Sequence, residues 1–148
     1  SLIKNPDARF IVIGMSLGGA IAMRSLQSFK HSDDVALAVF DSTFYSYRRV
    51  AYSVLRKSLV GTVVSPLTWV LLSDEYSGKH FLKKTTLPIL VVHDQSDPIV
   101  PPENALRIFN LINSKKEYWQ PNLGRHTGTF ADDQGEWRKK LLGYLETF

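Results

Sequence analysis

Three short apolar runs stand out along the chain. Residues 9–13, 36–40 and 88–92 are rich in Val, Ile, Leu and Ala, with few polar interruptions. Continuous apolar runs of this length are typical of strands that are buried on both faces of a sheet. A fourth strand is expected over 117–119, just before a loop rich in Gly and Thr. The pattern therefore predicts four strands.

Between these strands, apolar side chains recur at the three- and four-residue spacing of a helix. This spacing covers 17–29, 103–112 and 137–148. Pro101 and Pro102 precede the second of these segments, where the first turn of a helix accepts proline. Because strands and helices alternate with short connections, we expect an α/β fold with a mostly parallel sheet and helices on both faces.

One segment interrupts the alternation. Residues 44–87 are too long for a connection and too apolar for an exposed loop. We expect them to form two or three short helices, a small cap over the end of the sheet, within a single domain spanning 1–148. The sequence leaves open whether this cap contacts a ligand or only packs as core.

Composition narrows the class of protein. The 148 residues include 18 Lys and Arg against 14 Asp and Glu, a formal net charge of +4. The basic residues come in scattered pairs and form no long block, so no nucleic-acid partner is expected. The chain has no cysteine and no His-x-x-His pair. We therefore expect neither disulfides nor a metal site, and nothing in the sequence calls for a cofactor.

The first residues, SLIKNPDARF, read as the middle of a protein and lack the features of a signal peptide. We therefore expect an upstream portion that holds further strands. Without it, the strand at 9–13 would be an exposed apolar edge, which favours self-association or pairing with the missing segment. No apolar run reaches the roughly 18 residues of a membrane span, so membrane contact is expected only through the upstream portion. The location in the cell stays open between the cytoplasm and a membrane-tethered position.

Polar residues suited to nucleophilic catalysis follow three of the expected strands. Ser16 lies within GMSLG after the first strand, Asp94 and Asp97 follow the third, and His126 follows the fourth. The carboxyl ends of parallel strands meet at one edge of a sheet, so these side chains are expected close together. A serine hydroxyl becomes a strong nucleophile when a neighbouring base removes its proton. The sequence thus predicts a Ser, His and Asp site at this edge.

These motifs resemble those of the α/β-hydrolases. GMSLG at 14–18 is similar to that family's nucleophile elbow, HDQSDPIVP at 93–101 to its acid loop, and GRH at 124–126 to its Gly-x-His loop. The resemblance covers nearly the whole chain, as the C-terminal half or more of such a fold, with the first strands absent. The small cap and the DSTF segment look most like short-capped esterases and the serine-aminopeptidase-like branches.

The resemblance implies a role for each part of the elbow. Ser16 would be the nucleophile, held in a strained turn that projects its hydroxyl from the sheet. The amide of Leu17 would donate to the oxyanion, aided by the positive end of the following helix. Gly14 and Gly18 are expected to be glycines because side chains there would clash with the neighbouring strand and helix.

The remaining catalytic roles fall on the two later loops. His126 would be the general base, and Asp97 would orient it and stabilise the imidazolium. Asp94 is the alternative acid, and it stands where the family often carries glycine. His93 ends a buried strand and is expected to be a hydrogen-bonded core residue.

The implied activity is that of a serine hydrolase that cleaves a carboxylic ester, or a thioester or small amide, through an acyl-enzyme. A carboxylesterase-like enzyme acting on a small-molecule ester is expected, with Met15, Phe44 and Trp69 contacting the substrate. The alternative is a non-catalytic binding module or an inactive fragment of a larger hydrolase. The absence of the upstream loop that would hold the second oxyanion donor favours inactivity of this chain on its own.

Overall fold

A computed structural model describes residues 9–131 and 135–148. Its centre is a single parallel sheet whose strands lie side by side in chain order. The strands are β1 (Phe10–Met15), β2 (Val35–Asp41), β3 (Ile89–Val92) and β4 (Lys116–Trp119). The predicted α/β class and the predicted parallel sheet are confirmed.

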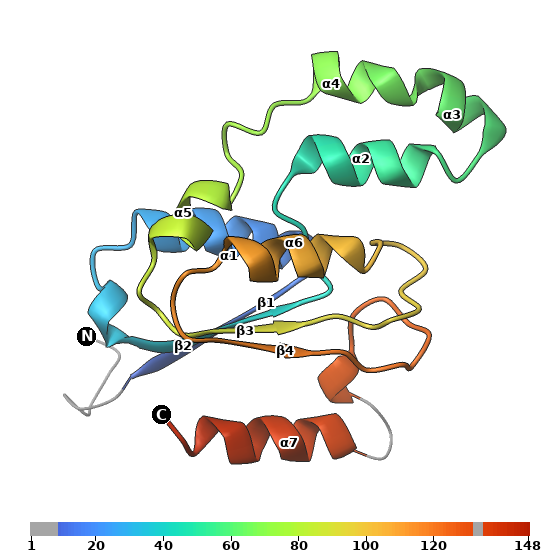
Figure 1. The fold of residues 1–148 in the computed structure, drawn as a ribbon. Helices are drawn as coiled ribbons and strands as arrows, with labels where there is room; N and C mark the ends of the chain where they lie inside the picture. Colours follow the sequence, from blue (N-terminus) through green and yellow to red (C-terminus); the bar gives the residue numbers. More distant parts are fainter. Residues whose placement is uncertain (1–8, 132–134) are drawn as a thin grey trace.

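Helices cover both faces of the sheet (Figure 1). One face carries α1 (Leu17–Gln27), α5 (Lys79–Lys84) and α6 (Glu103–Leu111), and the other carries α7 (Glu136–Leu145). Three single turns of 3-10 helix, at Ser32–Asp34, Ser65–Leu67 and Thr129–Ala131, complete the elements.

Alternation along β2 and β3 divides the core into two layers. Ala38, Phe40, Ile89 and Val91 pack under α1, α5 and α6. Leu37, Val39, Leu90 and Val92 point the other way, toward Trp119 and α7. Both strands are fully buried, as the continuous apolar runs predicted, and each buried Val, Leu or Ile contributes about 1.5–3 kcal/mol. The central strands are therefore the rigid base from which the loops of the sheet edge emerge.

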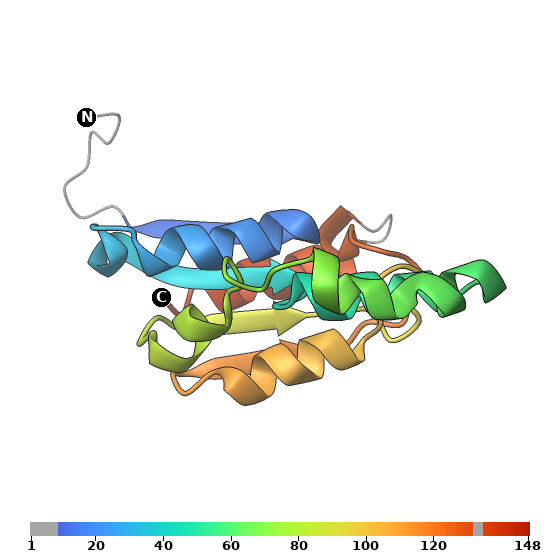
Figure 2. The same cartoon turned by 90° about the horizontal axis from the view of Figure 1, so that it is seen from above.

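The segment 44–87 divides into two parts. Helices α2 (Tyr47–Leu55), α3 (Leu59–Val64) and α4 (Thr68–Leu71) form a hairpin that extends past the carboxyl ends of the strands (Figure 2). Helix α5 instead inserts Phe81 and Leu82 into the core beside α1 and α6. We call residues 45–72 the cap hairpin.

Within the part of the chain that the structure describes, strand β1 has a neighbour on one side only. Its side chains Phe10, Ile11, Ile13 and Met15 are 39–50% exposed. The edge is thus apolar and open, as the sequence predicted. Among the described residues, no helix is both long and apolar enough to cross a bilayer.

Candidate active site

The turn between β1 and α1 consists of one residue, Ser16. Its backbone has φ 50° and ψ −125°, a conformation that non-glycine residues rarely adopt. Two hydrogen bonds hold it there: the Ser16 amide donates to the Asp41 carbonyl at 2.9 Å, and the Thr43 hydroxyl donates to the Ser16 carbonyl at 2.6 Å. The surrounding structure therefore fixes a strained turn at the end of the strand.

Two glycines allow helix α1 to pack close to this turn. A Cβ at Gly14 would lie 2.7 Å from the Gly19 Cα, and a Cβ at Gly19 would lie 2.5 Å from the Thr43 Oγ1. The clash predicted for Gly18 is wrong, because nothing lies within 4 Å of a Cβ there. Gly18 is on the exposed side of α1, and Gly19 faces the end of β2.

Ser16, His126 and Asp97 form a continuous hydrogen-bonded chain. The Ser16 Oγ lies 2.8 Å from the His126 Nε2, and the His126 Nδ1 lies 2.7 Å from the Asp97 Oδ2. A carboxylate only accepts, so Nδ1 donates and Nε2 is left to accept the serine proton. The Asp97 side chain is fully buried, while the His126 side chain is 14% exposed. A buried carboxylate therefore orients the imidazole, and the imidazole itself is partly accessible to solvent.

Two backbone amides fix the second oxygen of Asp97. The amides of Ile99 and Val100 donate to the Asp97 Oδ1 at 2.8 and 2.9 Å. The buried His93 Nε2 lies 2.9 Å from the Val100 carbonyl and 3.3 Å from the Asp97 Oδ2. Since the carbonyl only accepts, His93 donates there, and its ring borders the carboxylate from the core.

Asp94, the alternative acid, points away from the imidazole. Its Oδ1 accepts from the amides of Ser96 at 2.8 Å and Gly124 at 3.2 Å, and its Oδ2 accepts from the amide of Leu123. It therefore joins the loop that carries Asp97 to the loop that carries His126. The structure brings Asp97 to His126 and leaves Asp94 as a brace between the two loops.

The end of β2 supplies a support that sequence reasoning missed. The Ser42 hydroxyl accepts from the Thr127 amide at 3.2 Å, next to His126, and the Thr43 hydroxyl holds the Ser16 carbonyl. Asp41 is fully buried; its Oδ1 accepts from Ser42, and burial raises the pKa of this carboxyl above its ordinary value of 3.8. The run Asp41-Ser42-Thr43, which closes a strand at the same sheet edge, was the available signal.

The expected substrate contacts do not share one surface. Met15 is half exposed on β1, whereas Phe44 is buried against Ala20 and Val100. Trp69 lies on α4, where it lines a hollow of about 400 Å³ between the cap hairpin and α6. Leu17 is the first residue of α1, so its amide belongs to the helical turn that has no partner within the helix.

The described residues contain no group of three His, Asp or Glu side chains placed to hold a metal ion.

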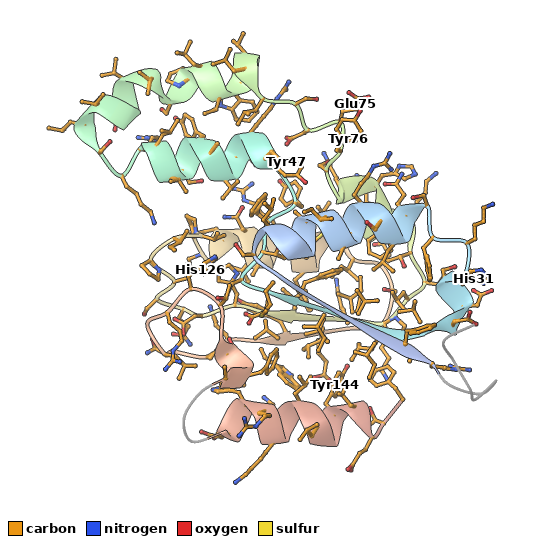
Figure 3. The ribbon with its side chains drawn as sticks, turned by 180° about the vertical axis from the view of Figure 1, so that it is seen from behind. His31, Tyr47, Glu75, Tyr76, His126 and Tyr144 are labelled. Atoms are coloured by element: carbon orange, nitrogen blue, oxygen red, sulfur yellow. The ribbon has the colours of Figure 1, made fainter. Side chains whose placement is uncertain are left out.

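The labelled view in Figure 3 places His126 and Tyr47, the first residue of α2, toward the same end of the molecule. The Ser16, His126 and Asp97 chain thus lies on the side where the cap hairpin leaves the body.

Solved structures share this arrangement of elements. The metagenomic α/β-hydrolase MGS-MChE2, from lagoon sediments of Mar Chica, Morocco, superposes with a TM-score of 0.66 at 19% identity, over 95% of this chain and 62% of that one. The chain has the α/β-hydrolase fold. Acetyl xylan esterase 1 from Thermoanaerobacterium sp. JW/SL YS485 shares the α/β-hydrolase fold with a TM-score of 0.63 at 18% identity, over 97% of this chain and 47% of that one.

Comparison of sequences finds curated relatives that align with most of this chain. No family model matches the chain. Protein YfhR of Escherichia coli K12 is 24% identical over 143 residues, which are 95% of this chain and 46% of YfhR. Protein bem46 of Schizosaccharomyces pombe is 27% identical over 119 residues, which are 78% of this chain and 38% of bem46. The chain spans less than half the length of the curated relatives it matches.

Proposed function

We propose that this α/β-hydrolase fold serves a serine hydrolase that cleaves a carboxylic ester through an acyl-enzyme. The observation that carries the proposal is the chain of hydrogen bonds from Ser16 Oγ through His126 to Asp97, at 2.8 and 2.7 Å. The positive φ at Ser16 adds to it, because strain of this kind is tolerated where the surroundings enforce it, often at functional sites.

The proposed reaction has two halves. Ser16 Oγ attacks the ester carbonyl while His126 Nε2 takes its proton, and the Leu17 amide donates to the resulting oxyanion. The tetrahedral adduct then collapses: the C–O bond to the alcohol breaks, and His126 returns the proton to the departing alcohol. A water molecule, deprotonated by His126, next attacks the acyl-Ser16 ester. Collapse of that adduct releases the carboxylic acid and reprotonates Ser16.

Each supporting residue has a role that its contacts suggest. Asp97 keeps the His126 proton on Nδ1 and stabilises the imidazolium that forms. Thr43 and the Asp41 carbonyl hold the backbone of Ser16. A carboxylic ester is the substrate class we favour, in line with the acetyl xylan esterase that shares the fold. The Pyrococcus horikoshii acylaminoacyl peptidase, which also shares the fold, supports the small-amide alternative.

A binding-only module is the second candidate. This chain covers less than half of YfhR and of acetyl xylan esterase 1, so further oxyanion donors would lie outside the described residues. That coverage favours the binding-only module. The two candidates differ in whether Ser16 forms a covalent adduct.

Covalent labelling with a fluorophosphonate probe, followed by hydrolysis of p-nitrophenyl acetate, separates the two. We expect labelling at Ser16 that is lost in Ser16→Ala and kept in Ser28→Ala, whose exposed hydroxyl lies at the far end of α1. Ester turnover should fall by orders of magnitude in Ser16→Ala alone. The assays use the full-length protein. Equal labelling of its wild type and Ser16→Ala would refute the proposal, and so would an unlabelled full-length wild type that is folded.

A further inference from the structure

The outer face of the cap hairpin is the most exposed apolar surface of the described chain. Leu59 is 90% exposed, Val63 80%, Val70 79%, Val60 76% and Leu71 75%. Their spacing places them along one face of the nearly continuous turns from α3 to α4. Figure 1 shows these helices as the layer farthest from the sheet. We call these five residues the aliphatic ridge.

The inner side of the same helices already has a partner. Val64, Leu67 and Leu72 face Ala51 and Val54 of α2 across a hollow of about 440 Å³, and Leu71, at the edge of the ridge, also borders it. The hairpin is therefore a two-layer unit whose ridge is exposed in the described part of the chain. A contiguous patch of this kind marks an interaction site more often than scattered single residues do.

Polar groups along the ridge are satisfied within the hairpin. The Thr62 hydroxyl donates to the Ser58 carbonyl at 2.9 Å, the Ser65 hydroxyl to the Thr62 carbonyl at 3.0 Å, and the Thr68 hydroxyl to the Ser65 carbonyl at 2.7 Å. Hydroxyls that bond back to the helix keep their partners when water is removed. The ridge can thus enter an apolar medium at a small desolvation cost.

The charge of the hairpin has one sign. Residues 44–72 contain Arg48, Arg49, Arg56 and Lys57 and no Asp or Glu, while the remaining 14 Lys and Arg balance the 14 Asp and Glu. The whole net charge of +4 therefore belongs to the hairpin. All four basic residues lie on α2 or directly after it, one helix layer behind the ridge.

We propose that the cap hairpin docks on an anionic phospholipid surface. The aliphatic ridge would enter the boundary between headgroups and acyl chains by roughly 5–10 Å, the depth typical of interfacial helices. Arg49 lies on α2 beside the hollow toward α6, and Arg56 directly follows α2. Packed helices lie about 8–10 Å apart, so both charges would lie about one Debye length from the phosphate layer. This docking differs from the expectation that membrane contact requires the upstream portion, and it does not depend on the chemistry of Ser16.

A lipid surface fits the ridge better than a second copy or another protein does. A symmetric contact between two hairpins would bring two sets of four positive charges together. The cores of protein interfaces are enriched in aromatic residues and Met, whereas the ridge consists of Val and Leu. An aliphatic surface needs no complementary shape in fluid acyl chains.

Co-sedimentation with vesicles tests the proposal. We expect the chain to bind phosphatidylcholine vesicles containing phosphatidylserine more tightly than pure phosphatidylcholine vesicles, with affinity that falls as salt rises. The triple variant Leu59→Asn, Val63→Asn, Val70→Asn should lose about tenfold or more in affinity. Arg49→Gln with Arg56→Gln should lose about 25-fold, at roughly fivefold for each charge.

Matched controls keep the result specific to the hairpin. Leu142→Asn changes a 57% exposed residue on α7, and Lys30→Gln with Lys139→Gln removes two exposed charges elsewhere; both should bind like the wild type. Circular dichroism checks that each variant is folded. Equal vesicle binding by the triple variant and the wild type overturns the proposal. Absence of vesicle binding by the wild type overturns it too. A wild-type oligomer that the triple variant no longer forms would show that the ridge binds a second copy, and this would also overturn the proposal.

Discussion

At the scale of single residues, the backbone of Ser16 is held in a conformation that a side chain disfavours. A residue in this region costs about 1–3 kcal/mol relative to ordinary backbone. Glycine adopts a positive φ without that cost, whereas alanine retains it. The geometry of the elbow and the stability of the fold are thus in conflict at this position.

Replacement of Ser16 measures this conflict. We expect Ser16→Gly to unfold at a higher temperature than Ser16→Ala, because only glycine relieves the positive φ. Both variants lose the hydroxyl, so neither should react with a fluorophosphonate. Thermal unfolding followed by circular dichroism gives the comparison, and a lower midpoint for the glycine variant would contradict the strain.

Asp41 makes a second residue-scale prediction, about pH. Burial raises the pKa of Asp41 in the folded chain above its ordinary value of 3.8. As the pH rises through this range, the unfolded chain loses the proton first, so Asp41 progressively lowers the free energy of unfolding. This loss should be complete above the raised pKa and should be absent in Asp41→Asn.

Urea unfolding from about pH 3 to pH 7 measures the difference. The free energy of unfolding of Asp41→Asn minus that of the wild type should increase with pH. Asp33→Asn, which changes an exposed carboxyl on the turn before β2, is the control variant measured beside it. A difference for Asp41→Asn that stays constant with pH would show that its carboxyl titrates alike in both states.

At the scale of elements, the site depends on two loops that are joined by Asp94. The loop after β3 carries Asp97, the loop after β4 carries His126, and the Asp94 carboxylate accepts from the amides of Leu123 and Gly124. A buried acceptor of several amides is costly to lose. The two Asp residues therefore act differently: one orients the imidazole, and the other holds its loop in place.

Matched amide substitutions distinguish these two roles. Asp97→Asn should lower ester turnover by several orders of magnitude with the fold intact, because the Nδ1 proton loses its acceptor. Asp94→Asn should lower the thermal midpoint, because an amide nitrogen there would face a backbone amide, and it should lower turnover less. Turnover assays and thermal unfolding on both variants give the answer. A greater loss of turnover in Asp94→Asn would exchange their roles.

Elements were predictable from the sequence where one physical signal dominated. The strands β2 and β3 are buried on both faces, so their apolar runs left no alternative. Helix α5 was harder, because six residues with only Phe81 and Leu82 buried resemble the apolar cap around them. The run Asp41-Ser42-Thr43 placed Thr43 at the sheet edge, but only the structure shows that its hydroxyl donates to the Ser16 carbonyl. Gly18 and Gly19 look alike in sequence, and only the packing of α1 separates them.

At the scale of the whole molecule, the sheet ends in an open apolar strand. Ile11 and Ile13 on β1 are 39% and 49% exposed, and within residues 9–131 and 135–148 the strand pairs with β2 alone. Open edges of this kind pair readily with another strand. We propose that β1 pairs with a further segment of the full protein or, in its absence, with a second copy.

Light scattering on the 148-residue chain tests this edge. We expect the chain to self-associate, and Ile13→Lys to reduce the association, because a lysine on an edge strand opposes pairing. Leu106→Lys, which changes a 45% exposed residue on α6, is the matched control and should leave the association unchanged. Equal association of the wild type and Ile13→Lys would place the contact elsewhere.

The bond between Ser16 and His126 joins residues 110 positions apart. During synthesis, Ser16 leaves the ribosome 110 residues before His126 and lacks its proposed base until the loop after β4 has followed it. Under the proposed function, a nascent chain without His126 is therefore a poor nucleophile toward esters. Reaction of Ser16 with a covalent probe would consequently report that the loop after β4 has been made and has folded against the end of β1.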